Sequence, residues 1–185
     1  MNELKPEYTR VTECLYFLTG LSKVNPEVLK NAADRGTRVH ISCDALIEGL
    51  AIFPQDDELG YIESFKKWYG SKTFLKKPDR WYDDEFMITG ECDCIYKEDG
   101  ELVLVDFKTP ANESKTWSLQ LSAYAYMAKK QGLQFKRIEA VKLCKQGRNA
   151  KTFIYADEFD LFKKCLEIYR TFLKQNRDIE IAEYL

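Results

Sequence analysis

Residues 90–109, GECDCIYKEDGELVLVDFKT, contain two apolar runs on either side of an Asp-Gly pair. Asp99 and Gly100 together are a strong signal for a tight hairpin turn. We therefore expect two antiparallel strands, over about 86–96 and 101–108. Charged residues occur at the far ends of both runs, which is unusual for strands that are otherwise apolar enough to be buried.

The register of this hairpin decides which charged side chains meet. It places Asp93 opposite Asp106 and Glu91 opposite Lys108, and period-two alternation puts all four on one face. The other face is apolar, is expected in the core, and consists of Cys92, Cys94, Tyr96, Val103, Val105 and Phe107. A turn of another length would shift the pairs, but a shift of two residues would keep the faces.

Two aspartates that face each other across paired strands repel, and burial adds a desolvation cost. A divalent cation would remove both costs, and carboxylate oxygens suit Mg²⁺ or Mn²⁺. Lys108 points to the same face as Asp106 and could orient an attacking water or stabilise charge on a phosphate. The alternative is a solvated strand end, at which Lys108 pairs with Glu91 and has no chemical role.

Three further polar residues lie on stripes that are otherwise apolar. A helix expected over 116–131 carries Gln120 and Tyr124 on its apolar face, within reach of a metal site or a scissile phosphate. His40, the only histidine, lies on the inward stripe of a long helix, with Gly36 one turn earlier. As a ligand, imidazole suits Mn²⁺ better than Mg²⁺. The alternatives are a partly exposed glutamine and a core histidine with its hydrogen bonds satisfied.

The order of the elements predicts the fold class. The expected helices lie over about 26–50, between Asp57 and Gly70, over 116–131 and over 157–175, with a second hairpin around Gly147. Residues 8–22 fit either a helix or a strand. This order predicts an α/β domain with a mixed β-sheet flanked by helices. We expect one domain over 1–185, with a helical N-terminal part over about 1–80 and the sheet and its helices over about 81–185.

Composition sets limits on the function. The 185 residues are 45% hydrophobic and 31% charged, and no apolar run is long enough to span a membrane. The first ten residues lack the apolar stretch of a secretory signal, so we expect a cytoplasmic protein with free thiols. A net charge of −2 does not exclude nucleic acid, because a basic groove can occur on an acidic protein. Two basic clusters could flank such a groove or simply face solvent: Lys72, Lys76, Lys77 and Arg80, and Lys142, Lys145, Arg148 and Lys151.

Short motifs occur in a recognisable order from about residue 35 to 126, roughly half of the chain. They are RGTRVH, GECD, DFKT and QLSAY. This series resembles the PD-(D/E)xK nuclease superfamily. It is similar in particular to the nuclease domains of helicase–nuclease recombination machines, to CRISPR-associated spacer-processing nucleases and to phage exonucleases. The resemblance implies a restriction-endonuclease-like fold.

The resemblance also implies roles for individual residues. The implied ligands of Mg²⁺ or Mn²⁺ are His40, Asp93, Asp106 and the carbonyl of Phe107. Lys108 would position the nucleophilic water, and Gln120 and Tyr124 would support the site or contact DNA. An acid on the preceding strand often completes such sites, and Asp84 and Glu85 are both candidates. Some relatives hold an iron–sulfur cluster with three cysteines near the C-terminus, but only Cys165 lies in the last forty residues here, so we expect no cluster.

These implications predict a metal-dependent deoxyribonuclease, an exonuclease rather than an endonuclease, acting on single- or double-stranded DNA. The expected setting is recombination, repair or phage DNA metabolism, in a bacterial cytoplasm or a phage-infected cell. A homo-oligomer and a recombination partner protein both stay open. Two alternatives also stay open: an inactive DNA-binding or scaffolding module of the same fold, and a metal-dependent hydrolase with another substrate.

Overall fold

The computed structural model describes residues 8–70, 72–75, 77 and 79–174. Its helices are α1 (Val11–Leu15), α2 (Pro26–Ile47), α3 (Leu59–Tyr69), α4 (Thr116–Lys130) and α5 (Phe159–Ile168), with short turns η1 (Tyr16–Leu18) and η2 (Leu21–Lys23) and a final π-helical turn η3 (Tyr169–Lys174). Its strands are β1 (Thr9–Arg10), β2 (Thr73–Phe74), β3 (Trp81–Asp83), β4 (Ile88–Gly90), β5 (Cys94–Glu98), β6 (Glu101–Lys108), β7 (Phe135–Lys142) and β8 (Lys151–Tyr155). None of the helices in these ranges has the length and apolar character needed to cross a membrane.

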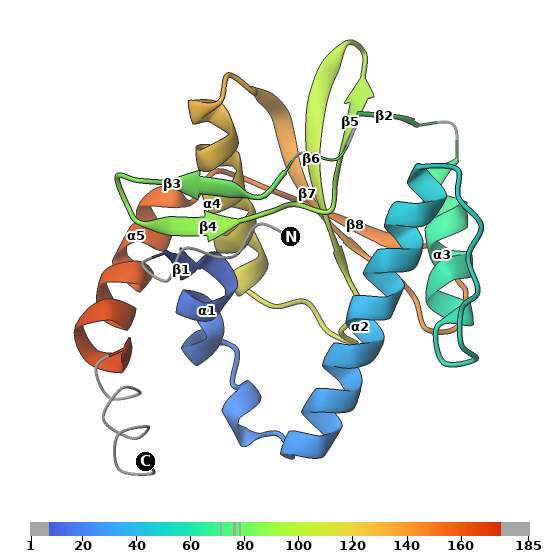
Figure 1. Cartoon of the computed structure of the whole chain (residues 1–185), viewed down its shortest axis with the longest axis horizontal. Coiled ribbons are helices and arrows are strands. Elements are labelled where there is room, and N and C mark those ends of the chain that lie inside the picture. The colour runs from blue at the N-terminus through green and yellow to red at the C-terminus, as the bar shows by residue number, and fades with distance from the viewer. Residues whose placement is uncertain (1–7, 71, 76, 78, 175–185) are drawn as a thin grey trace.

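A five-stranded mixed sheet forms the centre of the molecule, in the order β2-β5-β6-β7-β8 (Figure 1). Strands β6 and β7 are parallel and α4 connects them, whereas the other neighbours are antiparallel. The predicted mixed sheet with flanking helices is therefore confirmed. A second sheet of three short strands, in the order β1-β4-β3, was not predicted.

Helices cover both faces of the five-stranded sheet. Helices α2 and α3 pack on one face, where Phe65 and Phe107 are fully buried. Helices α1, α4 and α5 form the core of the other face, where Leu104 and Leu121 are fully buried. The alternation of apolar residues along β6 thus supplies two cores, as expected for a strand that is covered on both sides.

The hairpin has the predicted register from Cys94 opposite Val105 to Glu98 opposite Glu101. The first of its two expected strands is interrupted, however, because β4 belongs to the small sheet and β5 to the large one. The three residues between them, 91–93, carry the chain from one sheet to the other. Asp93 therefore lies just before the ladder begins, where its N–H donates to the carbonyl of Val105 at 3.1 Å.

This interruption corrects two predictions. Glu91 does not pair with Lys108, because its carboxylate accepts from Arg80 and the ammonium of Lys108 pairs with Asp106. Cys92 is buried in the core beneath α4 and not on the α2 face with Cys94. A period-two pattern holds only while the chain remains in one strand, so it failed at the first residue outside β5.

Helix α2 begins as predicted. The side-chain oxygen of Asn25 accepts from the N–H groups of Glu27 and Val28, and Pro26 occupies the first helical position. Arg38 ties this helix to the start of α3 through an ion pair with Asp57 at 3.1 Å and a second one with Glu58, which is buried. The segment left undecided over 8–22 forms β1, α1, η1 and η2.

Candidate active site

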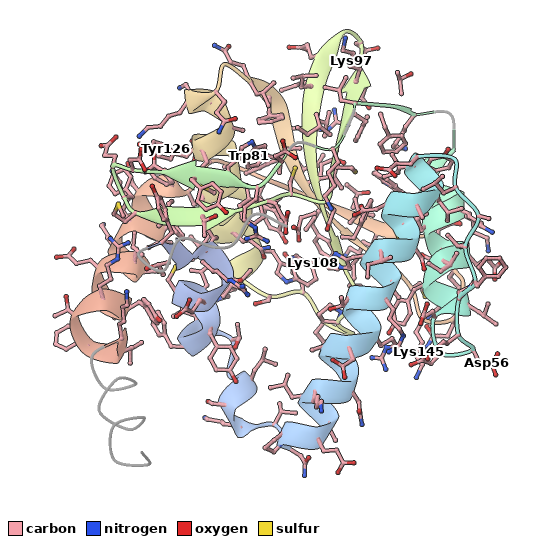
Figure 2. All side chains as sticks on the ribbon, in the orientation of Figure 1. Asp56, Trp81, Lys97, Lys108, Tyr126 and Lys145 are labelled. Carbon is pink, nitrogen blue, oxygen red and sulfur yellow. The ribbon has the colours of Figure 1, made fainter. Side chains whose placement is uncertain are left out.

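One cavity of about 380 Å³ lies where β5 begins and β6 ends, between the two helical layers. All seven residues singled out in the sequence line it: His40, Asp93, Asp106, Phe107, Lys108, Gln120 and Tyr124. They come from α2, the 91–93 link, β6 and α4. We call this space the carboxylate cavity; Figure 2 labels Lys108, which lies near the middle of the molecule.

Asp93 is held by contacts to both of its carboxylate oxygens. Oδ2 accepts the backbone N–H of Phe107 at 2.5 Å, and Oδ1 lies 2.8 Å from Nδ1 of His40. Burial alone would raise the pKa of Asp93, but the charge and hydrogen bond of His40 and the N–H of Phe107 bring it below its ordinary value. Burial acts in the opposite sense on His40, and Asp93 nevertheless raises the pKa of the imidazole. The two groups therefore stabilise each other's charged form.

Asp106 is the second carboxylate, and Lys108 and Gln120 hold it. Nζ of Lys108 lies 2.5 Å from Oδ2 of Asp106 and donates to Oε1 of Gln120 at 2.7 Å. Nε2 of Gln120 donates to the hydroxyl of Tyr124 at 3.0 Å and lies 3.4 Å from Oδ1 of Asp106. Gln120 and Tyr124 of α4 thus lie next to Asp106 and Lys108 of β6. The side-chain amide of Gln120 acts there both as a hydrogen-bond donor and as an acceptor.

The two carboxylates differ in their titration. Burial and the nearby charge of Asp93 raise the pKa of Asp106 above its ordinary value, although Lys108 counteracts this. Burial also raises the pKa of the Tyr124 phenol well above its usual range, so this hydroxyl stays neutral. The pocket therefore holds one carboxylate that ionises readily and one that resists ionisation.

Two glycines lie beside the cavity residues, and one of them is required by the packing. A Cβ on Gly90 would lie 2.3 Å from the ring of Tyr124, so only glycine lets the aromatic ring lie against the end of β4. A Cβ on Gly36 would lie 3.4 Å from Oγ1 of Thr109, which is ordinary contact. Gly36 thus allows the close approach predicted for it, although its position does not exclude a small side chain.

The remaining candidates have other surroundings. Asp84 accepts from Tyr8, and Glu85 from Lys130 and Tyr126, and neither lines the carboxylate cavity. The third acid on the cavity wall, beside Asp93 and Asp106, is Glu91. The side chain of Phe107 is buried in the α2 core, so only its backbone is available to the cavity, and the role of its carbonyl as a ligand stays a prediction.

Arg10, Arg80 and Thr109 also line the cavity and were not named as site residues from the sequence. Arg80 belongs to the basic cluster noted there, but its guanidinium is paired with Glu91. Arg10 is exposed, at the end of a two-residue strand that had no recognisable pattern. Only the pairing of β1 with β4 brings it to the cavity.

Comparison with known proteins agrees with this geometry. A family model described as the PD-(D/E)XK nuclease superfamily matches residues 56–182, which is more than half of the chain. The chain belongs to the PD-(D/E)XK nuclease superfamily. The match includes Asp93, Asp106, Lys108 and Gln120 and begins after His40, so the place of His40 in the site rests on its contact with Asp93.

Curated proteins and solved structures add little to the family assignment. No curated protein matches the chain. Among solved structures, "Crystal structure of SSO0001" superimposes with a TM-score of 0.48 at 12% sequence identity, covering 90% of this chain and 75% of that chain.

PD-(D/E)XK nucleases generally use divalent metal ions such as Mg²⁺ or Mn²⁺. The donor chemistry of the carboxylate cavity fits such an ion, because two buried carboxylates supply hard oxygen donors and an imidazole lies beside them. Within the described residues, no three side chains of histidine, cysteine, aspartate or glutamate form a ready ligand cluster. Each carboxylate is instead engaged by protein donors: Asp93 by His40 and Phe107, and Asp106 by Lys108 and Gln120.

Proposed function

We propose that this nuclease hydrolyses phosphodiester bonds of DNA with Mg²⁺ or Mn²⁺. Membership of the superfamily establishes the nuclease fold and a nucleic-acid substrate as the coarse assignment. The observation that carries the finer proposal is the hydrogen-bonded group of Asp106, Lys108 and Gln120, which faces the His40–Asp93 pair across a single cavity. A structural ion pair would not need this convergence of four chain segments on a solvent-accessible space.

The proposed reaction adds water across one phosphodiester. The oxygen of water bonds to phosphorus, one P–O ester bond breaks, and a proton reaches the leaving oxygen. Lys108 has its ammonium fixed between two oxygens, so it points at the cavity with little reorganisation and can orient the water or stabilise the phosphate charge. A divalent ion, held by the carboxylates of Asp93 and Asp106 with His40 and the carbonyl of Phe107 as further donors, would supply charge neutralisation at the phosphate.

The other residues have supporting roles in this proposal. Gln120 holds the ammonium of Lys108 and the hydroxyl of Tyr124 at once, so it sets the direction of both. His40 keeps Asp93 ionised. The resemblance of the sequence motifs supports exonuclease action on single- or double-stranded DNA. It also supports a role in recombination, repair or phage DNA metabolism in the cytoplasm. A homo-oligomer or a recombination partner protein would be further components of this proposal.

Cleavage assays on matched substrates test the proposal. Linear duplex DNA labelled at either end and covalently closed circular DNA are each incubated with Mg²⁺, Mn²⁺ or EDTA. We expect metal-dependent loss of the linear DNA, with the label released first giving the polarity. Cutting of the circle would show an endonuclease instead.

Variants separate chemistry from folding in the same assay. Lys108→Ala is expected to abolish cleavage, while Lys130→Ala is the matched control, because Lys130 also pairs with a buried aspartate, Asp83, at 2.6 Å. Asp83 and Lys130 lie outside the carboxylate cavity, so this control should keep its activity. Equal cleavage by both variants contradicts the assignment of Lys108. DNA binding by the unsubstituted protein without any cleavage favours the inactive module.

A further inference from the structure

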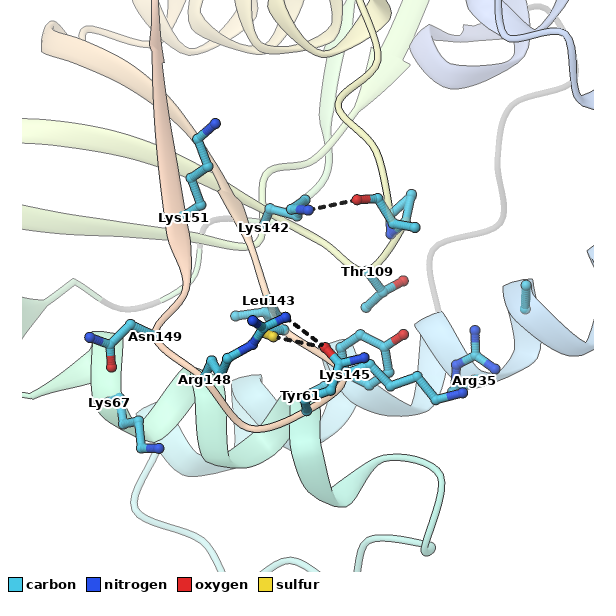
Figure 3. A pocket seen from close by; sticks show the side chains of 15 residues that line it. Arg35, Tyr61, Lys67, Thr109, Lys142, Leu143, Lys145, Arg148, Asn149 and Lys151 are labelled. Carbon is cyan, nitrogen blue, oxygen red and sulfur yellow. Dashed lines mark hydrogen bonds between the residues drawn. The ribbon is translucent and has the colours of Figure 1, made fainter.

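A second cavity of about 1010 Å³ adjoins the carboxylate cavity, because Thr109 and Pro110 line both. Its walls are formed by α2, α3, the segment after β6 and the turn between β7 and β8 (Figure 3). Among the described residues, no aspartate or glutamate lines it, whereas six cations do, namely Arg35, Lys67, Lys142, Lys145, Arg148 and Lys151. We call this space the cationic cavity.

Most of these charges are not neutralised. Within the described ranges only Lys67 has a carboxylate partner, Glu63 at 2.9 Å. Lys142 donates to the carbonyl of Ala111 at 2.6 Å, which leaves its positive charge uncompensated. Nε of Arg35 is buried with no hydrogen-bond partner in the structure. Five cations without counter-charges repel one another, so a fold that keeps them together is suited to an anion that binds there.

The turn that carries the cationic cavity is held firmly by α3. A Cβ on Gly60 would lie 1.8 Å from the carbonyl oxygen of Lys145, so the helix and the turn are in direct backbone contact. The N–H of Cys144 donates to the buried hydroxyl of Ser64 at 2.9 Å, and Lys67 donates to the carbonyl of Gly147 at 2.6 Å. Figure 2 shows Lys145 close to α3. The cations are therefore presented on a fixed backbone, which lowers the entropy cost of binding.

The other basic cluster in the sequence, Lys72, Lys76, Lys77 and Arg80, is partly neutralised by carboxylates. Lys77 pairs with Asp44 at 2.6 Å and Arg80 pairs with Glu91, so both charges are compensated. Nζ of Lys72 lies over the ring of Trp68 at 4.7 Å. Lys76 lies outside the described residues. Lys72 and Arg10 also have no carboxylate partner among the described residues, but they are single charges, whereas five such cations line the cationic cavity, which meets the carboxylate cavity at Thr109 and Pro110.

We propose that the cationic cavity binds the sugar-phosphate backbone of the DNA strand whose scissile phosphate lies in the carboxylate cavity, on one side of the cleavage point. The proposal rests on the proposed function, since it assigns a place to that substrate. Its basis is the shared wall of the two cavities, the unpaired cations and the lack of acids among the described residues of the wall. The strand would gain phosphate contacts with each nucleotide that extends past Pro110, so binding should depend on its length on that side.

Salt-dependent binding tests this proposal without requiring cleavage. The probe is a fluorescein-labelled single-stranded DNA of 24 nucleotides, measured by anisotropy in EDTA over a range of salt concentrations. The variant Lys145→Ala/Arg148→Ala/Lys151→Ala removes three exposed cations of the cavity. Log K falls as log salt rises, and each lost phosphate contact makes this negative slope shallower by about 0.7 for single strands, so we expect the slope of the variant to be shallower by about 2.

A control variant matches this change in charge. Lys97→Ala/Lys129→Ala/Lys164→Ala removes three exposed lysines that do not line the cationic cavity and should keep the slope. An unchanged slope in the cavity variant, or an equal decrease in the control, overturns the proposal. A series of shorter probes should show an increase in affinity with length that the cavity variant lacks.

The outcomes separate the two proposals. If the unsubstituted protein cleaves DNA and the cavity variant binds it with an unchanged slope, the cationic cavity is wrongly assigned and the proposed function stands. If the unsubstituted protein neither binds nor cleaves DNA, the proposed function fails and this inference fails with it.

Discussion

The carboxylate cavity and the cationic cavity share Thr109 and Pro110, yet their charges are arranged in opposite ways. In the first, every charge of the proposed site is paired: His40 with Asp93, and Lys108 with Asp106. In the second, five of six cations have no carboxylate partner among the described residues. Ion pairing fixes the positions of side chains, as catalysis requires. Unpaired charge attracts a ligand of opposite charge, as binding requires.

Among variants that keep the four charged residues of the carboxylate cavity, the largest effect is expected at Gln120, which holds Lys108 and Asp106. Gln120→Leu removes the acceptor of Lys108 and the donor to Tyr124. We expect kcat for DNA cleavage to fall about 10- to 100-fold, a range typical of residues that orient a metal site from outside it. Steady-state cleavage of linear DNA measures the change.

Ser122→Ala on the same helix provides the control for Gln120→Leu. The hydroxyl of Ser122 accepts the N–H of Glu158 at 2.8 Å and is buried away from the cavity. This variant should lose about 1 kcal/mol of stability and keep its kcat. If Gln120→Leu also keeps its kcat, the pairing in the carboxylate cavity does not control the chemistry.

The next effect concerns the glycine beneath the paired charges. Gly90→Ala places a methyl group against the ring of Tyr124, and we expect a loss of about 1–3 kcal/mol in the free energy of unfolding, with reduced cleavage. Gly36→Ala meets only the hydroxyl of Thr109 at 3.4 Å and improves helix propensity, so it should be neutral or stabilise by up to about 1 kcal/mol. Urea unfolding of both variants measures the difference. An equal effect at the two positions would contradict the tight contact at Gly90.

A smaller effect is expected from the acid that resists ionisation. The pKa of Asp106 is raised above its ordinary value near 3.8 by burial and by Asp93, so this residue favours folding below that pH, and the contribution is lost as pH rises through the raised pKa. An asparagine at this position does not titrate, so the Asp106→Asn variant does not lose stability in this way as pH rises. In EDTA, the stability of Asp106→Asn relative to the parent should therefore increase from pH 4 to pH 7, as measured by urea unfolding.

Asp160 tests the direction in which stability changes with pH, because its pKa is shifted the opposite way from that of Asp106. Lys163 lowers the pKa of this exposed carboxylate, so its contribution is present above the ordinary value and is lost on acidification. Asp160→Asn should therefore lose stability relative to the parent as pH rises from the lowered pKa towards the ordinary value of 3.8, and the difference should change little above it. Matching trends in the two variants would contradict the difference between the buried and the exposed acid.

The smallest change expected is in thiol reactivity beside the cationic cavity. Although its surroundings partly desolvate Cys144, hydrogen bonds from the backbone and from Arg148 lower the pKa of its thiol, whereas burial raises the pKa of the other five cysteines. Cys144 should react first with iodoacetamide, with a midpoint below the usual thiol pKa. Mass spectrometry of the alkylated protein identifies the residue. Faster reaction of Cys165, which is more buried than Cys144, would contradict this order of reactivity.

Local patterns predicted much of the site because they are decided by short-range geometry. The turn at Asp99-Gly100 set the register, and the 3.6-residue period placed Gln120 with Tyr124 and His40 on inward faces. The pairing of Glu91 with Lys108 was wrong because the chain changes sheets after Gly90, where it packs against the ring of Tyr124, a contact between residues distant in sequence.

The two basic clusters of the sequence also show that local patterns do not predict contacts between distant residues. Lys77 and Lys145 both occur in basic stretches, yet among the described residues only Lys77 has a carboxylate partner, Asp44, thirty-three residues away. Arg35 was overlooked because a single arginine on an amphipathic helix has no distinguishing pattern. Composition identifies where positive charge is concentrated, and tertiary contacts decide whether it is neutralised.

The candidate site on either side of the 91–93 link depends on both helical layers being in place. Asp93 needs α2 docked on one face of the sheet to meet His40, fifty-three residues earlier, while Asp106 needs α4 docked on the other face to meet Gln120. A partly folded chain with only one layer in place lacks half of the site. The assembled pocket is thus a property of the completed fold, and we expect the nascent polypeptide to have no nuclease activity until both helical layers have packed on the sheet.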